Sequence, residues 1–252
     1  MSGSISQSPL ISVQMPVYNR AEYLREAAES IAAQTVREIE LVMVDDGSTD
    51  DTPRIMDELA SEYSGRLVIR CIHQEHLGIA AARNRALRES RGSFAAFLDS
   101  DDLWVPEKAE KQLSFFGANP GCEIVFCRYR NFYSPGETEI TPEKEKLAGE
   151  RDQWCLAAAM VRRKVFDRVG PYSEKMIVGE DSEWVTRARL LGVNIDFCIE
   201  EELYLRRIHA SNITLGYGGG GANYARVLAA SIRNANRIRR KGIADFSADS
   251  SL

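Results

Sequence analysis

The chain has 252 residues and a formal net charge of -5, and its 44% hydrophobic and 27% charged residues are ordinary globular values. These figures exclude wholesale disorder and a fibrous class, and the acidic balance gives no reason to expect nucleic-acid binding. Five cysteines without Cys-x-x-Cys spacing exclude a zinc ribbon and a complete disulfide framework, so reduced thiols are expected.

The sequence predicts a cytoplasmic protein. It contains no apolar run of about eighteen residues, the length that a membrane-spanning helix needs. Residues Met1 to Pro9 also lack the basic start and apolar centre of a signal peptide. Membrane contact, where it occurs, is therefore expected to be peripheral, at the inner face.

Strands and helices are predicted to alternate up to Leu98. Apolar runs predict strands, and apolar residues at three- and four-residue spacing predict the helices between them. The predicted strands are Leu10–Val17, Ile39–Val44, Leu67–Ile72 and Ser93–Leu98, and the helices run near Tyr23–Ile31, Ile55–Leu59 and Ile79–Leu87. This alternation predicts an α/β fold with a mostly parallel sheet and helices on both faces.

The second half of the chain is less regular. A helix is predicted over Pro106–Phe116, a strand over Cys122–Tyr133 and another helix over Val161–Val169. The polar stretch Ser134–Gln153 contains two prolines and is predicted to be a surface loop. A last helix is predicted after Gly179, with Asp181 in its first turn; such a carboxylate has either a catalytic task or only the structural one of offsetting the helix dipole.

The end of the chain differs in composition. Gly216 to Gly221 predicts a hinge or lid, and Ala222 to Lys241 predicts an amphipathic helix whose charges are all basic. Such a helix either docks on its own domain with its arginines in solvent or lies on anionic lipid. Docking is the favoured alternative.

A buried strand is predicted to end abruptly in Asp99, Asp101 and Asp102. Carboxylates crowded at a strand end need a compensating positive charge, and hard oxygen ligands suit Mg²⁺ or Mn²⁺, ions that commonly bridge to phosphates. Tyr18 and Asp46 follow two other predicted strands. Because ligands of parallel sheets gather at the carboxyl ends of the strands, these residues are predicted to share one phosphate-handling site.

Several short motifs in one order accompany the acidic turn. They are Val13–Asn19, Val44–Asp50, Ala82–Asn84, Leu98–Asp102 and Gly179–Asp181. In order and spacing this set resembles the family 2 glycosyltransferases, inverting enzymes with the nucleotide-diphospho-sugar transferase (GT-A) fold. The resemblance covers roughly Ile11 to Thr214. It implies a GT-A domain over residues 1–215, with a nucleotide-binding half at about 10–103 and an acceptor half at about 104–215, followed by a hinge and basic helix over 216–252.

The resemblance implies roles for the donor-side residues. Asp101 would ligate a divalent metal, Asp99 would contact the ribose or support the metal, and Asp102 would hold it through water. Tyr18 would stack on the base and Asp46 would accept the imide N–H of uracil or thymine, which favours a UDP- or dTDP-sugar. Two further residues are placed in the nucleotide site: Pro16, expected to shape the backbone, and Arg83, expected either at the base or diphosphate or exposed on its helix.

The resemblance also implies roles for the residues on the acceptor side. Asp181 would be the base that removes the acceptor hydroxyl proton, and Glu180 would orient it or bind acceptor. His209 would approach the metal or diphosphate, or else lie in a surface loop. Trp154 and Trp184 would wall the acceptor site, or else belong to the core.

The processive Gln-x-x-Arg-Trp motif is absent, which favours transfer of a single sugar to a carbohydrate or glycolipid acceptor in cell-surface polysaccharide, glycolipid or related synthesis. Two other functions remain open. A nucleotidyltransferase shares a related fold, although it would ordinarily carry a glycine-rich basic loop after the first strand. A sugar-nucleotide-binding module without turnover is the other, and the intact set Asp99, Asp101 and Asp181 argues against it.

Overall fold

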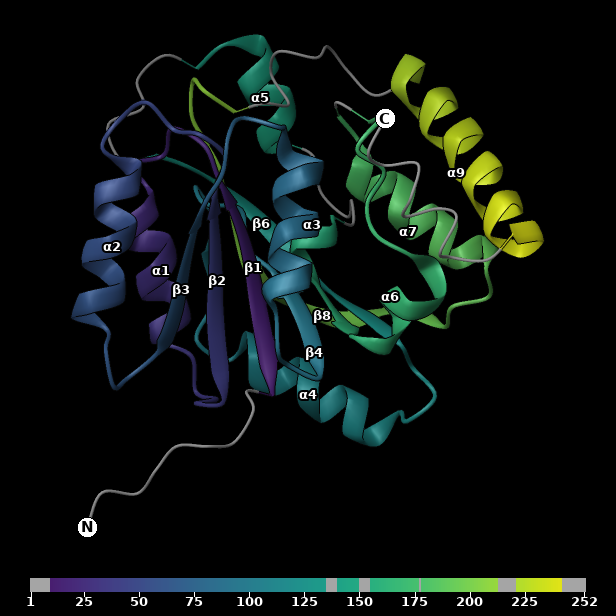
Figure 1. The fold of residues 1–252 in the computed structure, drawn as a ribbon, viewed down its shortest axis with the longest axis horizontal. Coiled ribbons are helices and arrows are strands. Elements are labelled where there is room, and N and C mark those ends of the chain that lie inside the picture. The colour runs from purple at the N-terminus through teal and green to yellow at the C-terminus, as the bar shows by residue number, and fades with distance from the viewer. Residues whose placement is uncertain (1–9, 135–139, 150–154, 177, 213–220, 242–252) are drawn as a thin grey trace.

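The computed structural model describes residues 10–134, 140–149, 155–176, 178–212 and 221–241. Its centre is an eight-stranded sheet with helices on both faces (Figure 1). The strand order is β3-β2-β1-β4-β7-β6-β8-β5. The strands are β1 Ile11–Val17, β2 Ile39–Asp45, β3 Val68–His73, β4 Phe94–Phe97, β5 Leu103–Trp104, β6 Ile124–Tyr133, β7 Ala159–Arg162 and β8 Ile195–Ile208.

The first four strands are parallel and in register, as the alternating pattern predicted. Val17 at the end of β1 pairs with Asp45 at the end of β2, and Asp45 pairs with His73 at the end of β3. The connections between these strands are the helices α1 Leu24–Ala32, α2 Thr52–Glu62 and α3 Ile79–Glu89. The loops that follow the strands therefore emerge side by side at one edge of the sheet.

The two faces of the sheet have separate apolar cores, and β2 contributes to both. Leu41 and Met43 belong to the core that holds α1, α2 and α4 (Lys108–Ala118), whereas Val42 and Val44 pack with α3 on the opposite face. Successive side chains of a strand point to opposite faces, so a strand covered on both sides is apolar at nearly every position. Both β1 and β2 are accordingly buried at every position and mainly apolar, and their polar residues Ser12, Gln14, Glu40 and Asp45 are buried as well.

The second half of the fold differs from prediction, because β5 and β8 were not predicted and two further stretches have another structure than expected. Residues 161–169 were predicted as one helix, but β7 occupies Ala159–Arg162 and only Lys164–Val169 is helical, as α6. The prediction was wrong because the apolar positions there serve one short buried strand and one short helix. Within the predicted loop Ser134–Gln153, Pro142–Gly149 forms the helix α5.

The final helix, α9 (Gly221–Lys241), packs along α7 (Glu180–Leu190) at the edge of the molecule (Figure 1). Its buried residues are Val227, Ala230, Ser231, Ala235 and Ile238. Glu183 of α7 receives hydrogen bonds on its carbonyl oxygen from the Ser231 hydroxyl, at 3.2 Å, and on Oε1 from the Asn234 amide, at 3.0 Å. The predicted docking of this helix on its own domain is confirmed.

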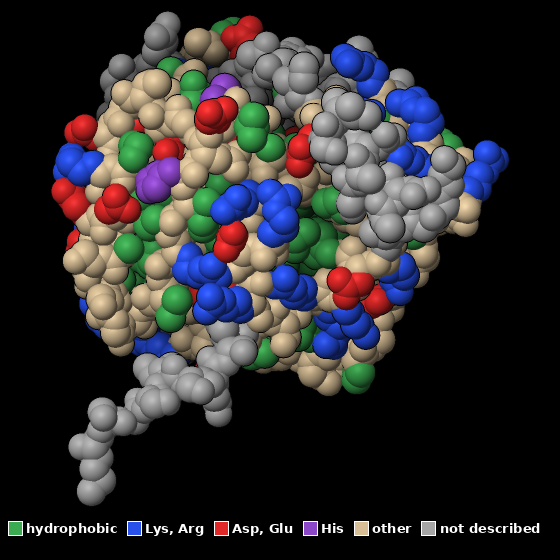
Figure 2. Space-filling model, in the orientation of Figure 1, with side chains coloured by type: hydrophobic (Ala, Val, Ile, Leu, Met, Phe, Trp, Pro, Cys, Tyr) green, Lys and Arg blue, Asp and Glu red, His purple; other side chains and the backbone are tan. Residues whose placement is uncertain are grey.

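The other face of α9 is basic. Arg226, Arg233 and Arg240 recur every seven residues and are exposed, and Ile232 beside them is 44% exposed. Figure 2 shows Lys and Arg side chains along the corresponding edge of the surface. None of the described helices is long and apolar enough to cross a membrane.

Candidate functional site

The strand-end loops form the first corner of the site, around Asp46. Its carboxylate is only 4% exposed and accepts hydrogen bonds on both oxygens. Oδ1 accepts from the Gln74 amide at 2.7 Å and from the Leu77 N–H at 3.0 Å, while Oδ2 accepts from the Gly78 N–H at 2.8 Å and lies 2.8 Å from Nδ1 of His76. Residues of the loop after β3 therefore surround the side chain of Asp46, which follows β2.

Tyr18 stands beside this corner and is 41% exposed, so it is accessible for the base-stacking role predicted for it. The His76 imidazole stacks on that ring, with centroids 4.3 Å apart and planes at 21°. His76 was not identified from the sequence, because a lone histidine in a polar loop carries no pattern. Pro16 is buried in β1, opposite Val44 and beyond the end of the β1–β4 pairing. There its missing N–H removes no β1–β4 bond, which agrees with a backbone-shaping role.

The acidic turn after β4 contains carboxylates with unequal surroundings, and Asp102 is the most enclosed. Tyr204 donates its hydroxyl to Asp102 Oδ2 at 2.6 Å, and the Arg207 N–H donates to Oδ1 at 2.7 Å. Burial and the negative charges of Asp101 and Asp99 raise the pKa of Asp102 well above its usual value. Asp102 thus ties the turn to β8, and neither Tyr204 nor Arg207 was singled out from the sequence.

Asp101 faces positive charge instead. Its Oδ2 lies 3.0 Å from Nε of Arg20 and 3.0 Å from Nε2 of His209. Burial by itself raises the pKa of Asp101, but the His209 hydrogen bond and the Arg20 charge outweigh it and lower that pKa. His209 is 2% exposed, so it is not a surface-loop histidine, and Arg20 is a site residue that the sequence reasoning missed.

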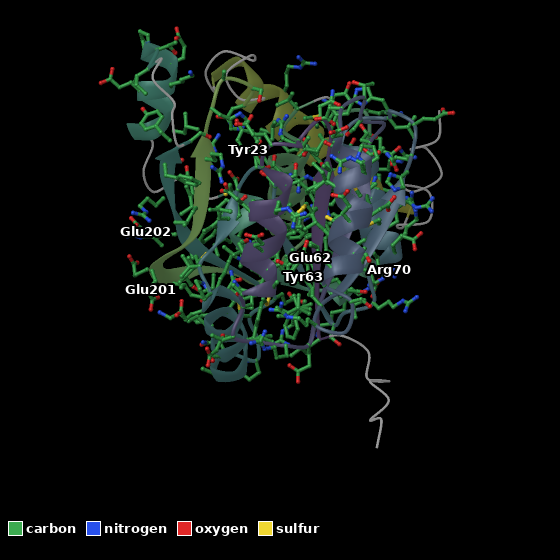
Figure 3. All side chains as sticks on the ribbon, turned by 90° about the vertical axis from the view of Figure 1, so that its left-hand side faces the viewer. Tyr23, Glu62, Tyr63, Arg70, Glu201 and Glu202 are labelled. Atoms are coloured by element: carbon green, nitrogen blue, oxygen red, sulfur yellow. The ribbon has the colours of Figure 1, made fainter. Side chains whose placement is uncertain are left out.

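His209 is held on its other side by Tyr23. The two rings have centroids 4.5 Å apart, and Tyr23 lies near the upper end of the molecule in Figure 3. The Ser211 hydroxyl lies 2.8 Å from Nδ1 of His209, which leaves Nε2 directed at Asp101. The imidazole is therefore fixed at the acidic turn by contacts from two directions.

Arg83 connects the acidic turn to the start of α7. Its Nη2 donates to Asp99 Oδ1 at 3.0 Å and its Nε donates to Glu180 Oε1 at 3.2 Å. The side chain is 4% exposed, so the alternative of an exposed helical arginine is wrong. Burial alone lowers the pKa of Arg83, but Asp99 and Glu180 more than reverse this, so the guanidinium is a permanent cation.

Both partners of Arg83 have shifted acidity. Burial and the charges of Asp101 and Asp181 raise the pKa of Asp99, although Arg83 opposes the shift. Burial, and then the charge of Asp181, raise the pKa of Glu180 to about 7. The negative charge of Asp181 thus contributes to the raised pKa of both carboxylates.

Asp181 lies in the first turn of α7, as predicted, and is partly exposed. Its Oδ1 accepts from the Ser182 N–H at 2.6 Å, and the helix N-terminus stabilises its charge. Gly179, just before the helix, has φ 84°, a left-handed conformation that glycine adopts without strain. The glycine thus permits the sharp entry that sets Glu180 inward and leaves Asp181 accessible.

The two tryptophans do not share a wall. Trp184 is 0% exposed, stacks on Phe166 with centroids 4.5 Å apart, and donates its indole N–H to the Gly170 carbonyl at 2.8 Å. It belongs to the core, so the acceptor-wall role predicted for it is wrong, because packing buries the ring on every side. Trp154 lies outside the described residues.

The donor atoms at the acidic turn suit a divalent ion. Asp99 and Asp101 offer carboxylate oxygens and His209 an imidazole nitrogen, a set that Mn²⁺ and Mg²⁺ accept when phosphates complete the coordination. Within the described ranges no group of three such residues is already arranged as a metal site. The residues therefore fit a divalent metal by the chemistry of their donor atoms, and they are not gathered into a preformed metal site.

The sequence profile described as "Glycosyl transferase family 2" matches residues 12–173, more than half of the chain. The chain belongs to this family. The match includes the three strand-end loops with Tyr18, Asp46 and the acidic turn, and it stops before α7. The family match agrees with a glycosyltransferase, the first of the three functions considered from the sequence.

Related sequences agree with this assignment. An uncharacterized glycosyltransferase of Rickettsia typhi, RT0329, is 36% identical over 222 residues, which are 82% of this chain and 66% of that protein. A chondroitin synthase of Escherichia coli is 36% identical over 135 residues, 54% of this chain and 19% of the synthase. The family 2 chain thus spans no more than about two thirds of either protein.

Solved structures share the fold. TarS of S. aureus, residues 1–349 in complex with UDP-GlcNAc, has a TM-score of 0.70 at 21% identity over 89% of this chain and 66% of that one. The mannosyltransferase PcManGT of Pyrobaculum calidifontis, in complex with GDP-Man and Mn²⁺, has a TM-score of 0.65 at 18% identity. The match covers 98% of this chain and 80% of that one. The chain has the GT-A fold, as predicted.

Proposed function

We propose that this chain transfers a single sugar from a UDP- or dTDP-sugar to an acceptor hydroxyl, with inversion at the anomeric carbon and with a divalent metal. The observation that carries the proposal is the bridge of Arg83 between Asp99 and Glu180. It joins the acidic turn that would hold the donor to the helix start that bears Asp181. Donor diphosphate and acceptor base would thus lie on either side of one buried cation.

Asp181 is proposed as the general base. In a single inverting displacement the acceptor hydroxyl attacks the anomeric carbon from the side opposite the leaving diphosphate, and a carboxylate there removes its proton. Asp181 has the required accessibility, since it is partly exposed, whereas Glu180 beside it is buried and bonded to Arg83. Glu180 is accordingly proposed to orient the region rather than to take the proton.

The donor would be bound by the other end of the site. Tyr18 offers an exposed ring for stacking and Asp46 a fixed carboxylate for the imide N–H of uracil or thymine. Asp101, Asp99 and His209 would hold the metal. When bound, a divalent ion stabilises the charge that develops on the departing diphosphate. Arg20, on Asp101, supplies a further positive charge at the same place.

The acceptor is proposed to be a carbohydrate or glycolipid in cell-surface polysaccharide, glycolipid or related glycoconjugate synthesis. For a lipid-linked acceptor, the outward basic face of α9 would bind anionic headgroups. Arg226, Arg233 and Arg240 all point to solvent there, and α9 contains no acidic residue. Each such arginine near an anionic surface contributes about 1 kcal/mol.

A screen of nucleotide sugars tests the proposal. UDP- and dTDP-sugars are expected to raise the melting temperature in the presence of manganese, and one of them should release nucleoside diphosphate in the presence of an oligosaccharide acceptor. With that pair, Asp181→Asn should lower kcat by about 10²- to 10⁴-fold while UDP affinity is retained. Asp167→Asn, an exposed carboxylate on α6, is the matched control. Near-native turnover by Asp181→Asn would reject the base, and binding of no nucleotide sugar would reject the proposed function.

A further inference from the structure

The imidazole of His76 has a defined hydrogen-bonding state. Its Nδ1 lies 2.8 Å from Oδ2 of Asp46 and 3.0 Å from the carbonyl oxygen of the same residue. Both atoms are acceptors only, so Nδ1 must carry the proton, and its hydrogen bond runs to the carbonyl oxygen. The Asp46 carboxylate oxygen Oδ2 lies within 2.8 Å of the same nitrogen as a close polar contact.

The same ring also covers Tyr18. The two planes are 21° apart with centroids at 4.3 Å, which is a stacked arrangement. Gly47 makes this approach possible: it has φ +76°, and a Cβ at that position would lie 2.8 Å from the backbone nitrogen of His76. The loop carrying His76 can come this close only because residue 47 has no side chain.

Stacking on Tyr18 and placing a ring N–H close to the Asp46 carboxylate are the two features proposed above for a uracil or thymine base. A planar ring that has both at once lies where such a base would lie. We propose that His76 occupies the nucleobase subsite as an internal placeholder, which the base of the donor must displace in order to bind. This inference rests on the proposed function, because it takes the donor to be a uracil or thymine nucleotide.

The surroundings suit an exchange of this kind. The His76 side chain is 57% exposed, so it can leave the subsite without disturbing the core. Asp46 would stay in position, because Gln74, Leu77 and Gly78 still donate to its oxygens. A carboxylate has about four lone-pair positions, and these three donors leave one of them for the imide N–H of the base once His76 no longer lies against Oδ2.

The donor base must displace His76 in order to bind, and this weakens donor binding. Removing the His76 side chain should therefore strengthen donor binding. Isothermal titration of UDP in the presence of manganese is expected to give an affinity about two- to tenfold higher for His76→Ala than for the unaltered chain, the range of one aromatic pair. His76→Phe, which keeps a ring over Tyr18 but has no N–H, should gain less. Inorganic pyrophosphate, which has no base, should bind the unaltered chain and His76→Ala equally.

His73, at the end of β3, provides a matched control. His73 is 43% exposed and contacts Asp45 at 3.2 Å rather than Asp46, so His73→Ala should leave the UDP affinity unchanged. Unchanged or weaker UDP binding by a folded His76→Ala protein would overturn the placeholder, while the proposed function would stand. If the unaltered chain bound pyrophosphate but no uracil or thymine nucleotide, the proposed donor itself would fail.

Discussion

Nη2 of Arg83, a residue of α3 whose side chain is 4% exposed, donates a hydrogen bond to Oδ1 of Asp99 at 3.0 Å. The guanidinium simultaneously contacts Glu180, which is 5% exposed. Removing this cation should therefore leave the buried Glu180 carboxylate without compensation, whereas Asp99, with its side chain 36% exposed, keeps contact with solvent. Breaking a buried pair by deleting one partner costs about 3–5 kcal/mol.

We expect Arg83→Gln to lower the free energy of unfolding by about 3 kcal/mol or more, measured by urea denaturation monitored by circular dichroism. Arg85→Gln is the control, since Arg85 is on the same helix but is 44% exposed and pairs only with Glu89. An exposed pair of this kind contributes about 0.5 kcal/mol. Equal losses in the two variants would show that the Arg83 bridge adds nothing to stability.

The carboxylates of Asp101 and Asp102 should respond differently to substitution. Asp102→Ala removes the acceptor of the Tyr204 hydroxyl and of the Arg207 N–H, so it should destabilise the fold by about 2–4 kcal/mol. Tyr204→Phe removes one of these bonds and should cost about 1 kcal/mol. Asp101→Asn should lower the stability as well, because Arg20 and His209 lose the negative charge that they contact, but its distinguishing effect should be the loss of the increase in UDP affinity that manganese causes. Retention of that increase would contradict Asp101 as a metal ligand.

Glu180 should make stability depend on pH. Its pKa is about 7 in the fold against an ordinary 4.5, so between these values the folded state holds more protons than the unfolded state. The free energy of unfolding therefore falls as pH rises through this window, by at most about 3 kcal/mol. Glu180→Gln should remove this component. We expect the stability of the unaltered protein relative to Glu180→Gln to be greatest below pH 4.5 and lowest above pH 7, measured by urea denaturation across that window; a difference independent of pH would refute the raised pKa.

The basic face of α9 can be tested with vesicles. Co-sedimentation with phosphatidylglycerol-containing vesicles should fall about 100-fold in affinity when Arg226, Arg233 and Arg240 become glutamine, at about 1 kcal/mol for each. Phosphatidylcholine vesicles should bind neither protein, and salt should weaken the binding. The control is a triple glutamine variant of exposed arginines elsewhere, Arg54, Arg66 and Arg168. Equal losses in the two variants, or none in either, would refute a lipid-binding role for this face.

The parts of the fold with strong periodicity were predictable from the sequence. The first two strands are buried at every position, so their apolar runs stood out, and the polar loops after them followed from the parallel arrangement. Asp181 in a first helical turn was likewise readable from Gly179 and the apolar spacing after it. These features depend on local chemistry, which a single sequence contains.

The parts that depend on pairing between distant segments were not predictable. β8 carries Glu200 to Glu202, which lowers any strand signal, yet Glu202 pairs with Arg130 of β6 and Glu201 with Lys111. Figure 3 labels Glu201 and Glu202 on this strand. Arg20 and His76 were missed for the same reason. Each becomes a site residue only because the sheet register brings it to Asp101 or Asp46.

The packing of α9 along α7 affects how a shortened chain would be interpreted. Ser231 and Asn234 hold Glu183, which follows Asp181 by two residues, so the end of the chain braces the helix on which the proposed base stands. A C-terminal deletion would consequently impair catalysis even in an assay that contains no lipid. Only surface substitutions on α9 can separate anchoring from catalytic geometry.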